Sequence, residues 1–238
     1  MGVIKLKNKR KVIEILYNNL PCICDITKPL PPSKYVDIAK KFQLRNYKLC
    51  LTSDILKLGL MDELTKYQKE FIISAGACVA IFNTMNDKPI SMVFRALTKK
   101  EFMDISVCYC AYGFDLIDEN FKYGDWLLIT EGIYDSDCVR SIYKNSVAML
   151  TSNITVMQAQ ILKSLTNRFI IAFDNDSAGD SGYKKTLKRL KGSVIQKLNM
   201  YGSDKDLGVM CEGGFHTEGF SRRREYYDDE IQYIIENN

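Results

Sequence analysis

The residues best suited to chemistry are acidic and lie in two short motifs. In the stretch FIIAFDNDSAGDSGYKK (169–185), four apolar residues and a Phe lead directly into Asp174 and Asp176. In the earlier stretch LLITEGIYDSDCV, another apolar run leads into Glu131, with Asp135 one turn later. Carboxylate oxygens are the ligands that Mg²⁺ and Mn²⁺ prefer. The four acids together therefore indicate a divalent-ion site.

Each motif taken alone also has a purely structural explanation. Asp174 and Asp176 could cap the helix that follows them, and Gly132 could form a strand-to-helix turn in the left-handed conformation. If the two preceding strands are neighbours, however, the four acids converge at one edge of a sheet. Like charges a few ångströms apart repel each other unless a cation neutralises them. The conjunction of the motifs therefore favours a metal site over two unrelated turns.

The elements that must position these acids follow a regular rhythm from Gly124 onward. Uninterrupted apolar runs, typical of buried parallel strands, alternate with segments typical of helices. We expect strands at 126–130, 146–150, 168–173 and 193–200, and helices at 134–144, 155–165 and 177–191. Functional residues gather at the carboxyl ends of such strands. The segment after the fourth strand adds Asp204, Lys205 and Asp206 to the same edge.

The preceding part of the chain has a different pattern. Helical spacing predicts helices over 9–20, 33–42 and 52–70, and a stretch with four prolines near 21–35 must be irregular or extended. Two β-rich runs, 77–83 and 90–96, flank a turn sequence and predict an antiparallel hairpin with Arg95 near its end. The overall expectation is an α/β protein: a smaller α+β N-terminal subdomain (1–122), a parallel sheet flanked by helices (123–210), and a C-terminal helical tail (211–238).

Composition narrows the class of protein. The 238 residues are 46% hydrophobic and 26% charged, which is an ordinary globular profile. No apolar run is long enough to span a bilayer, and the basic N-terminus lacks the features of a secretory signal. We therefore expect no membrane partner and a cytoplasmic location. The net charge of +4 is modest, but basic clusters near the start, after Lys184 and at 222–224 suit a polyanion, unless they are only solvated helix faces.

The eight cysteines do not predict a zinc site. Their only close pairs are the C-x-C spacings Cys22/Cys24 and Cys108/Cys110, and the chain has one histidine, His216. Structural zinc sites usually show two ligand pairs at C-x₂₋₄-C spacing. We expect no zinc and mostly buried, reduced thiols.

The two acidic motifs resemble the signature motifs of the TOPRIM fold, which primases, topoisomerases and some nucleases share. The resemblance is greatest to DnaG-type primases of bacteria and phages. AMLTSNITVMQAQIL, SDKDLGVM and PISMVFRALTKKEFMDIS are also similar to primase segments, so the resemblance extends over about Lys40 to Gly208. The absence of a zinc module and of a Walker A motif departs from larger relatives. It favours a minimal, phage-encoded catalytic core, which would act in the host cytoplasm.

The resemblance implies roles for specific residues. Glu131 would be a metal ligand or the acid–base group at a 3′-hydroxyl, and Asp174 and Asp176 would bind Mg²⁺ or Mn²⁺ at the triphosphate. Asp135 would support the ion. Gly132 and Gly179 would allow close backbone approach. The expected phosphate-contacting residues are Arg95, Lys99 or Lys100, Lys184 and Lys205.

The implied activity is template-directed synthesis of RNA primers on single-stranded DNA from NTPs, with a replicative helicase as a separate chain. One alternative is a TOPRIM nuclease that uses the same carboxylates with water as the nucleophile. Another is a non-catalytic DNA-binding subunit. The complete set of acids argues against the second alternative, and the segment around Arg95 argues against a minimal nuclease.

Overall fold

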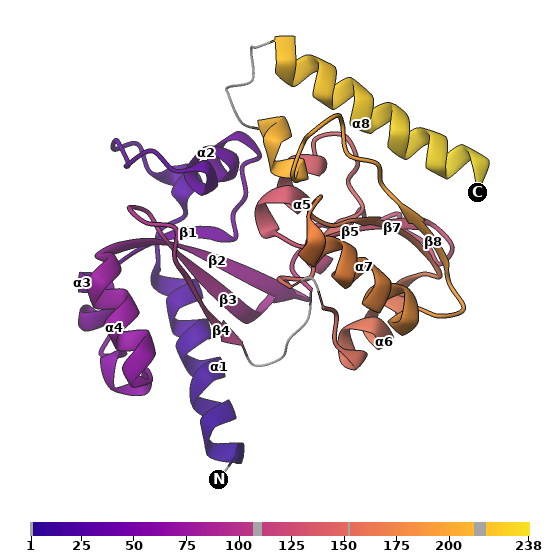
Figure 1. Ribbon diagram of the computed structural model, residues 1–238. Coiled ribbons are helices and arrows are strands. Elements are labelled where there is room, and N and C mark those ends of the chain that lie inside the picture. Colours follow the sequence, from indigo (N-terminus) through magenta and orange to yellow (C-terminus); the bar gives the residue numbers. More distant parts are fainter. Residues whose placement is uncertain (1, 107–110, 152, 212–217) are drawn as a thin grey trace. The chain divides into compact units, whose positions relative to one another are not determined.

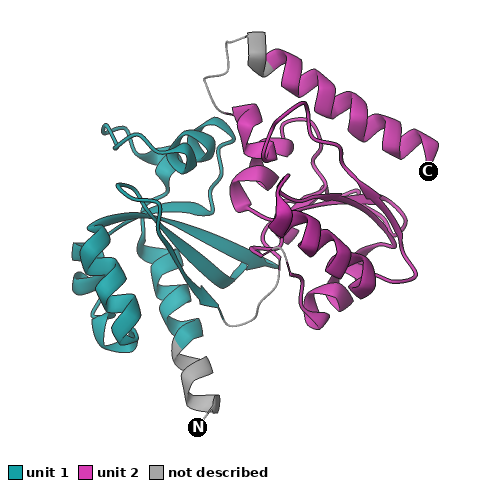
Figure 2. Cartoon of the chain, viewed as in Figure 1, with its two compact units in different colours: residues 1–109 teal, residues 110–238 magenta. Residues whose placement is uncertain are grey.

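The computed structural model describes residues 2–106, 111–151, 153–211 and 218–238. Cys108, Cys110 and His216 lie outside the described residues. The chain folds into two compact units, 1–109 and 110–238 (Figure 2). The units divide ahead of the expected boundary at residue 122, and the C-terminal helix belongs to the second unit.

The first unit contains a four-stranded antiparallel sheet in the order β1-β2-β3-β4 (Figure 1). The predicted hairpin is present as β2 (Ala77–Met85) and β3 (Lys88–Ala96). Asn86 and Asp87 connect these strands, and both have positive φ, as a tight two-residue hairpin turn requires. The strands β1 (Tyr47–Leu51) and β4 (Phe102–Ser106) complete the two edges, and the sequence pattern had not predicted them.

Helices cover the sheet of the first unit. They are α1 (Gly2–Asn19), α2 (Lys34–Lys41), α3 (Thr52–Lys57) and α4 (Lys66–Ala75), with short 3₁₀ turns at Ile23–Asp25 and Met61–Glu63. Leu16 of α1 and Phe71 of α4 join Phe82 and Phe94 of the sheet in one buried core. Since side chains alternate across a strand, Arg95 lies on the opposite face from Phe94. Its guanidinium lies over the ring of Tyr35 in α2, 5.5 Å from the centroid.

The second unit contains the predicted parallel sheet. Its strands are β5 (Trp126–Thr130), β6 (Ser146–Ala148), β7 (Arg168–Ala172) and β8 (Val194–Lys197), in the spatial order β6-β5-β7-β8. All three neighbouring pairs are parallel. β5 and β7 lie side by side in a register that pairs Thr130 with Ala172. The two strands that precede the acidic motifs are therefore neighbours.

Three helices connect these strands: α5 (Ile133–Val139), α6 (Val156–Leu165) and α7 (Ser177–Arg189). Leu162 of α6 and Leu190 after α7 pack with Ile129 and Phe169 in the core beneath one face of the sheet. α5 lies on the other side (Figure 1). Thr155 caps the start of α6 in a capping box with Gln158. Short 3₁₀ turns span Phe114–Leu116 and Leu207–Cys211.

The predicted C-terminal helix is α8 (Glu218–Asn237). It packs against its own unit through the buried side chains of Tyr227, Ile231 and Ile234. Among the described helices, none combines the length and apolar character needed to cross a membrane.

Candidate active site

The two acidic motifs meet at the carboxyl edge of the parallel sheet. Glu131 directly follows β5, and Asp174 follows β7 after Phe173. The backbone N–H of Asp174 donates a hydrogen bond to Oε1 of Glu131 at 3.3 Å. The backbone of Glu131 is held from the other side, because its carbonyl accepts a hydrogen bond from the N–H of Leu150 at 2.9 Å. Strand pairing therefore brings Glu131 and Asp174 together.

Asp176 is the N-cap of α7. Its Oδ1 accepts hydrogen bonds from the N–H groups of Ala178 (2.9 Å) and Gly179 (3.0 Å). The capping explanation therefore holds for Asp176. Capping uses one carboxylate oxygen, and Oδ2 faces the ammonium of Lys205 instead, at 3.8 Å. A cap and a ligand role are thus compatible in this residue.

Lys205 is the basic residue of this edge. Its Nζ lies 3.4 Å from Oδ2 of Asp174 and 3.8 Å from Oδ2 of Asp176. The charge of Asp174, followed by its hydrogen bond, raises the pKa of Lys205 above its ordinary value. The carbonyl of Lys205 accepts a 2.6 Å hydrogen bond from the N–H of Asn175, which lies between the two acids. Backbone and side chain of Lys205 thus both contact the Asp174–Asp176 loop.

Asp135 is the most buried of the four acids in the two motifs, with 9% of its surface exposed. It lies in the first turn of α5, and its Oδ1 accepts a hydrogen bond from the N–H of Gly208 at 2.8 Å. The N–H of Gly132 donates to the same carboxylate. Asp135 therefore connects the start of α5 to the segment after β8, which suits the supporting role expected of it.

Burial and mutual repulsion raise the pKa values of three acids at this edge. Burial, then the charges of Asp174 and Asp176, raises the pKa of Glu131 to about 7. Burial, then Asp206 and Asp174, raises the pKa of Asp135 to about 7. The pKa of Asp174 is also raised, chiefly by burial and by Asp206. Hydrogen bonding, first from Gly179, lowers the pKa of Asp176.

Two glycines are required here by space. A Cβ on Gly179 would lie 1.9 Å from the carbonyl oxygen of Asp174, so a side chain would displace the site loop. A Cβ on Gly132 would lie 2.5 Å from Oδ2 of Asp135. The alternative explanation of Gly132 as a left-handed turn is wrong, because its φ is −99°. Gly132 is needed because Asp135 folds back against it.

Lys184 lies on the exposed surface of α7, two turns after the capping Asp176. Its charge helps to lower the pKa of Asp180, after the larger effect of Lys197, which lies 2.8 Å from Asp180. Within the described residues, the charge of Lys184 therefore acts on Asp180.

The remaining predicted phosphate contacts belong to the first unit. Arg95 is half-buried over Tyr35. Lys99 pairs with Glu101 at 2.7 Å and donates to the hydroxyl of Ser74 at 3.1 Å, whereas Lys100 is exposed.

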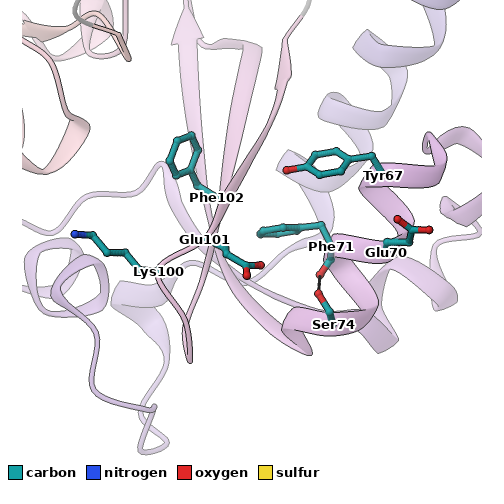
Figure 3. A pocket seen from close by; sticks show the side chains of 7 residues that line it. All are labelled: Tyr67, Glu70, Phe71, Ser74, Lys100, Glu101 and Phe102. Carbon is teal, nitrogen blue, oxygen red and sulfur yellow. Dashed lines mark hydrogen bonds between the residues drawn. The ribbon is translucent and has the colours of Figure 1, made fainter. Parts of the chain in front are cut away.

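Lys100 lines an open groove of about 570 Å³ between α4 and the β3–β4 connection (Figure 3). The rings of Tyr67 and Phe102, at the border of the groove, are 64% and 68% exposed. The full lining consists of Tyr67, Glu70, Phe71, Ser74, Lys100, Glu101 and Phe102.

The carboxylates fit a hard divalent cation. Glu131, Asp135 and Asp174 have raised pKa values partly because of neighbouring negative charges, and a cation would relieve this repulsion. Within the described residues, no three acidic, His or Cys side chains already stand in a ligand arrangement. Mg²⁺ does not require one, since it is commonly held by one or two carboxylates, with water and phosphate oxygens as the other ligands.

Sequence reasoning did not identify the role of Asp204. It was grouped with the converging acids, but its side chain turns to α8, where it bonds to Arg223 and Tyr227. Asp206, from the same segment, is the acid whose charge acts on Asp135 and Asp174.

One family model and several solved structures resemble this chain. Residues 128–208 match the Toprim-like family model. No curated protein sequence matches the chain. The structure of the DnaG primase catalytic domain bound to single-stranded DNA is 14% identical, with a TM-score of 0.65 over 98% of this chain and 80% of the other.

Two further solved structures are similar. The zinc-binding and RNA polymerase domains of Aquifex aeolicus primase give a TM-score of 0.66 at 17% identity, over 96% of this chain and 61% of the other. The RNA polymerase domain of Mycobacterium tuberculosis DnaG gives 0.61 at 13% identity, over 100% of this chain and 89% of the other. Residues 128–208 are therefore similar to the Toprim-like family, and the chain has the fold of DnaG-type primase catalytic cores.

Proposed function

We propose that the protein is a DNA primase that synthesises short RNA primers on a single-stranded DNA template. The observation that carries the proposal is the meeting of Glu131 and Asp174 at adjacent ends of β5 and β7, with Lys205 beside Asp174 and Asp176. Acids with raised pKa values next to a phosphate-binding cation are what nucleotidyl transfer needs. The likeness of the whole fold to primase catalytic cores supports this choice among TOPRIM activities.

Each side chain of the edge has a proposed task. Glu131, with a pKa near 7, accepts the proton of the attacking 3′-hydroxyl or binds the ion. Asp174 and Asp176 bind the ion at the triphosphate. Asp135, in the first turn of α5, supports the ion. Lys205 contacts phosphate oxygens when the triphosphate is present.

Mg²⁺ or Mn²⁺ would be held by Glu131, Asp174 and Asp176. When bound, such an ion lowers the pKa of a hydroxyl nucleophile and neutralises charge on the leaving pyrophosphate.

Nucleic acid and NTP phosphates are the proposed ligands of the remaining cations, Arg95, Lys99 or Lys100, and Lys184. An arginine fork suits phosphate because it can donate two parallel hydrogen bonds. The proposed partners are the DNA template, NTPs and a replicative helicase as a separate chain. We place the reaction in the cytoplasm, or in the host cytoplasm if a phage encodes the protein.

The test is a primer-synthesis assay with purified protein, single-stranded DNA of mixed sequence, labelled NTPs and Mg²⁺ or Mn²⁺. We expect short labelled oligoribonucleotides with the wild type and none with Asp174→Ala. Circular dichroism should show that the variant is folded. The matched control is Asp180→Asn, an exposed acid on α7 that should leave synthesis intact.

Two results would contradict the proposal. Degradation of RNA or DNA without NTP incorporation would identify a nuclease that uses the same carboxylates. Binding of single-stranded DNA with neither activity, alone or with a helicase, would identify a non-catalytic subunit.

A further inference from the structure

The C-terminal helix contacts the site through one buried carboxylate. Asp204, only 7% exposed, lies in the segment between β8 and the 3₁₀ turn at Leu207–Cys211. Nε of Arg223 lies 3.1 Å from both of its carboxylate oxygens. The hydroxyl of Tyr227, a fully buried side chain, donates to Oδ2 at 3.1 Å. Two residues one turn apart on α8 therefore hold Asp204. We call this group the Asp204 clamp.

The backbone at Asp204 and Lys205 is tied to the acidic loop. The side-chain amide of Asn175 donates to the carbonyl of Asp204 at 3.3 Å, and the N–H of Asn175 donates to the carbonyl of Lys205 at 2.6 Å. Asn175 lies between Asp174 and Asp176, whose carboxylates the ammonium of Lys205 approaches. A continuous set of hydrogen bonds thus runs from α8 to the proposed ligands.

Lys205 needs such support because its own side chain is exposed. With 62% of the side chain accessible, its long flexible stem has little packing to restrict it. Its position therefore depends on where its backbone is held. A buried carboxylate that loses its partners carries a large desolvation cost, so the backbone at Asp204 would move if the clamp were removed.

We propose that Arg223 and Tyr227 are positioning residues that set Lys205 against Asp174 and Asp176 through Asp204. The consequence for catalysis rests on the proposed function: α8 would act on triphosphate binding without touching the substrate. The structural core of the proposal does not depend on that function, so the two can be tested separately.

The first test measures the reactivity of Lys205 directly. The protein is treated with limiting acetic anhydride, and acetylation of each lysine is quantified by mass spectrometry. Lys197, ion-paired with Asp180 at 2.8 Å in the same unit, is the internal reference. We expect Tyr227→Phe and Arg223→Gln to raise the ratio of acetylation at Lys205 to acetylation at Lys197 severalfold. Arg223→Lys keeps the charge and should bring this ratio part of the way back to the wild-type value.

The controls separate the clamp from simple attachment of α8. Arg224→Gln removes another tether of the helix, the 2.9 Å bond to the carbonyl of Ser141, without touching Asp204. Tyr233→Phe removes an exposed hydroxyl from the same helix. Both should leave the ratio unchanged. An unchanged ratio in folded Tyr227→Phe and Arg223→Gln would overturn the proposal, as would an equal rise in Arg224→Gln.

The second test asks whether the clamp acts through Lys205. In the primer assay, Tyr227→Phe should raise the KM for NTP more than it lowers kcat, and Tyr233→Phe should change neither. In a Lys205→Ala background, Tyr227→Phe should have no further effect on KM, although it still lowers the melting temperature. An equal rise in KM in that background would show that the hydroxyl does not act through Lys205. If the wild type makes no primer, the proposed function fails, while the acetylation result still decides the clamp.

Discussion

Oε1 of Glu131 accepts a hydrogen bond from the backbone N–H of Asp174 at 3.3 Å. The bond crosses from β5 to β7, strands that are distant in sequence but adjacent in the sheet. It places the carboxylate of one strand at the backbone of the other, where the charge of Asp174 contributes to the raised pKa of Glu131. The site is thus held together by the same strand pairing that builds the domain.

We predict that Glu131→Gln stabilises the metal-free protein at pH 8. The pKa of Glu131 is raised to about 7, so the folded state holds a proton that the unfolded chain releases above about 4.5. Stability from this group is complete below the unfolded pKa and is lost as the pH rises through 7. One pKa unit is worth about 1.4 kcal/mol, but solvent screening at this half-buried site reduces the net effect to about 1 kcal/mol.

Urea unfolding in EDTA at pH 8 and pH 5 checks this prediction. The advantage of the variant should shrink at pH 5, because Glu131 is then mostly protonated in the folded state. Gln keeps an oxygen that can accept the bond from Asp174. A larger advantage at pH 5 than at pH 8 would contradict the raised pKa.

Divalent ions should stabilise the wild type more at pH 8 than at pH 6. A cation binds the deprotonated carboxylates, and protons compete with it for groups whose pKa is near 7. Melting temperatures measured with and without Mg²⁺ or Mn²⁺ report this linkage. Asp174→Asn should abolish the gain, whereas the control Asp180→Asn should keep it. An equal gain in both variants would point to ion binding elsewhere.

Two substitutions of Asp176 should separate its roles. Asn caps helices as well as Asp does, so Asp176→Asn should retain the melting temperature but lose ion-dependent primer synthesis. Asp176→Ala loses the bonds to Ala178 and Gly179 and should also melt a few degrees lower. Full activity in Asp176→Asn would leave this residue as a cap alone.

Gly179→Ala should both destabilise the protein and inactivate it. The new Cβ would lie 1.9 Å from the carbonyl oxygen of Asp174, and the loop must move to admit it. Such overpacking costs about 2 kcal/mol, which chemical denaturation can measure. Ser181→Ala, an exposed change in the same helix, should be nearly neutral. A stable, active Gly179→Ala variant would show that the close approach is not required.

Arg95→Gln should weaken binding of single-stranded DNA and reduce its salt dependence. Loss of one phosphate contact lowers the slope of log K against log salt by about 0.7 for a single strand. Fluorescence anisotropy at several salt concentrations measures the slope. Lys88→Gln, an exposed change in the β2–β3 hairpin, is the control because it removes the same amount of positive charge. The same slope for Arg95→Gln and the wild type would show that Arg95 does not contact the DNA phosphates.

The sequence predicted the elements whose signals are local. Apolar runs marked the first three parallel strands of the second unit, a mixed segment after a helix marked the fourth, and the turn around Asn86 and Asp87 marked the hairpin. The edge strands β1 and β4 were missed because their short, mixed patterns become strands only by pairing with β2 and β3.

The sequence by itself determined which side chains follow the strands, and hence that Glu131, Asp174 and Asp176 were available for one site. Only the tertiary structure decided that β5 and β7 are neighbours, because strand order depends on contacts between distant segments. It also decided that Asp135 excludes a side chain at Gly132, and that Asp204 turns away to α8. Residue type and periodicity are local properties, whereas packing distances and hydrogen-bond partners arise only when the whole domain has folded.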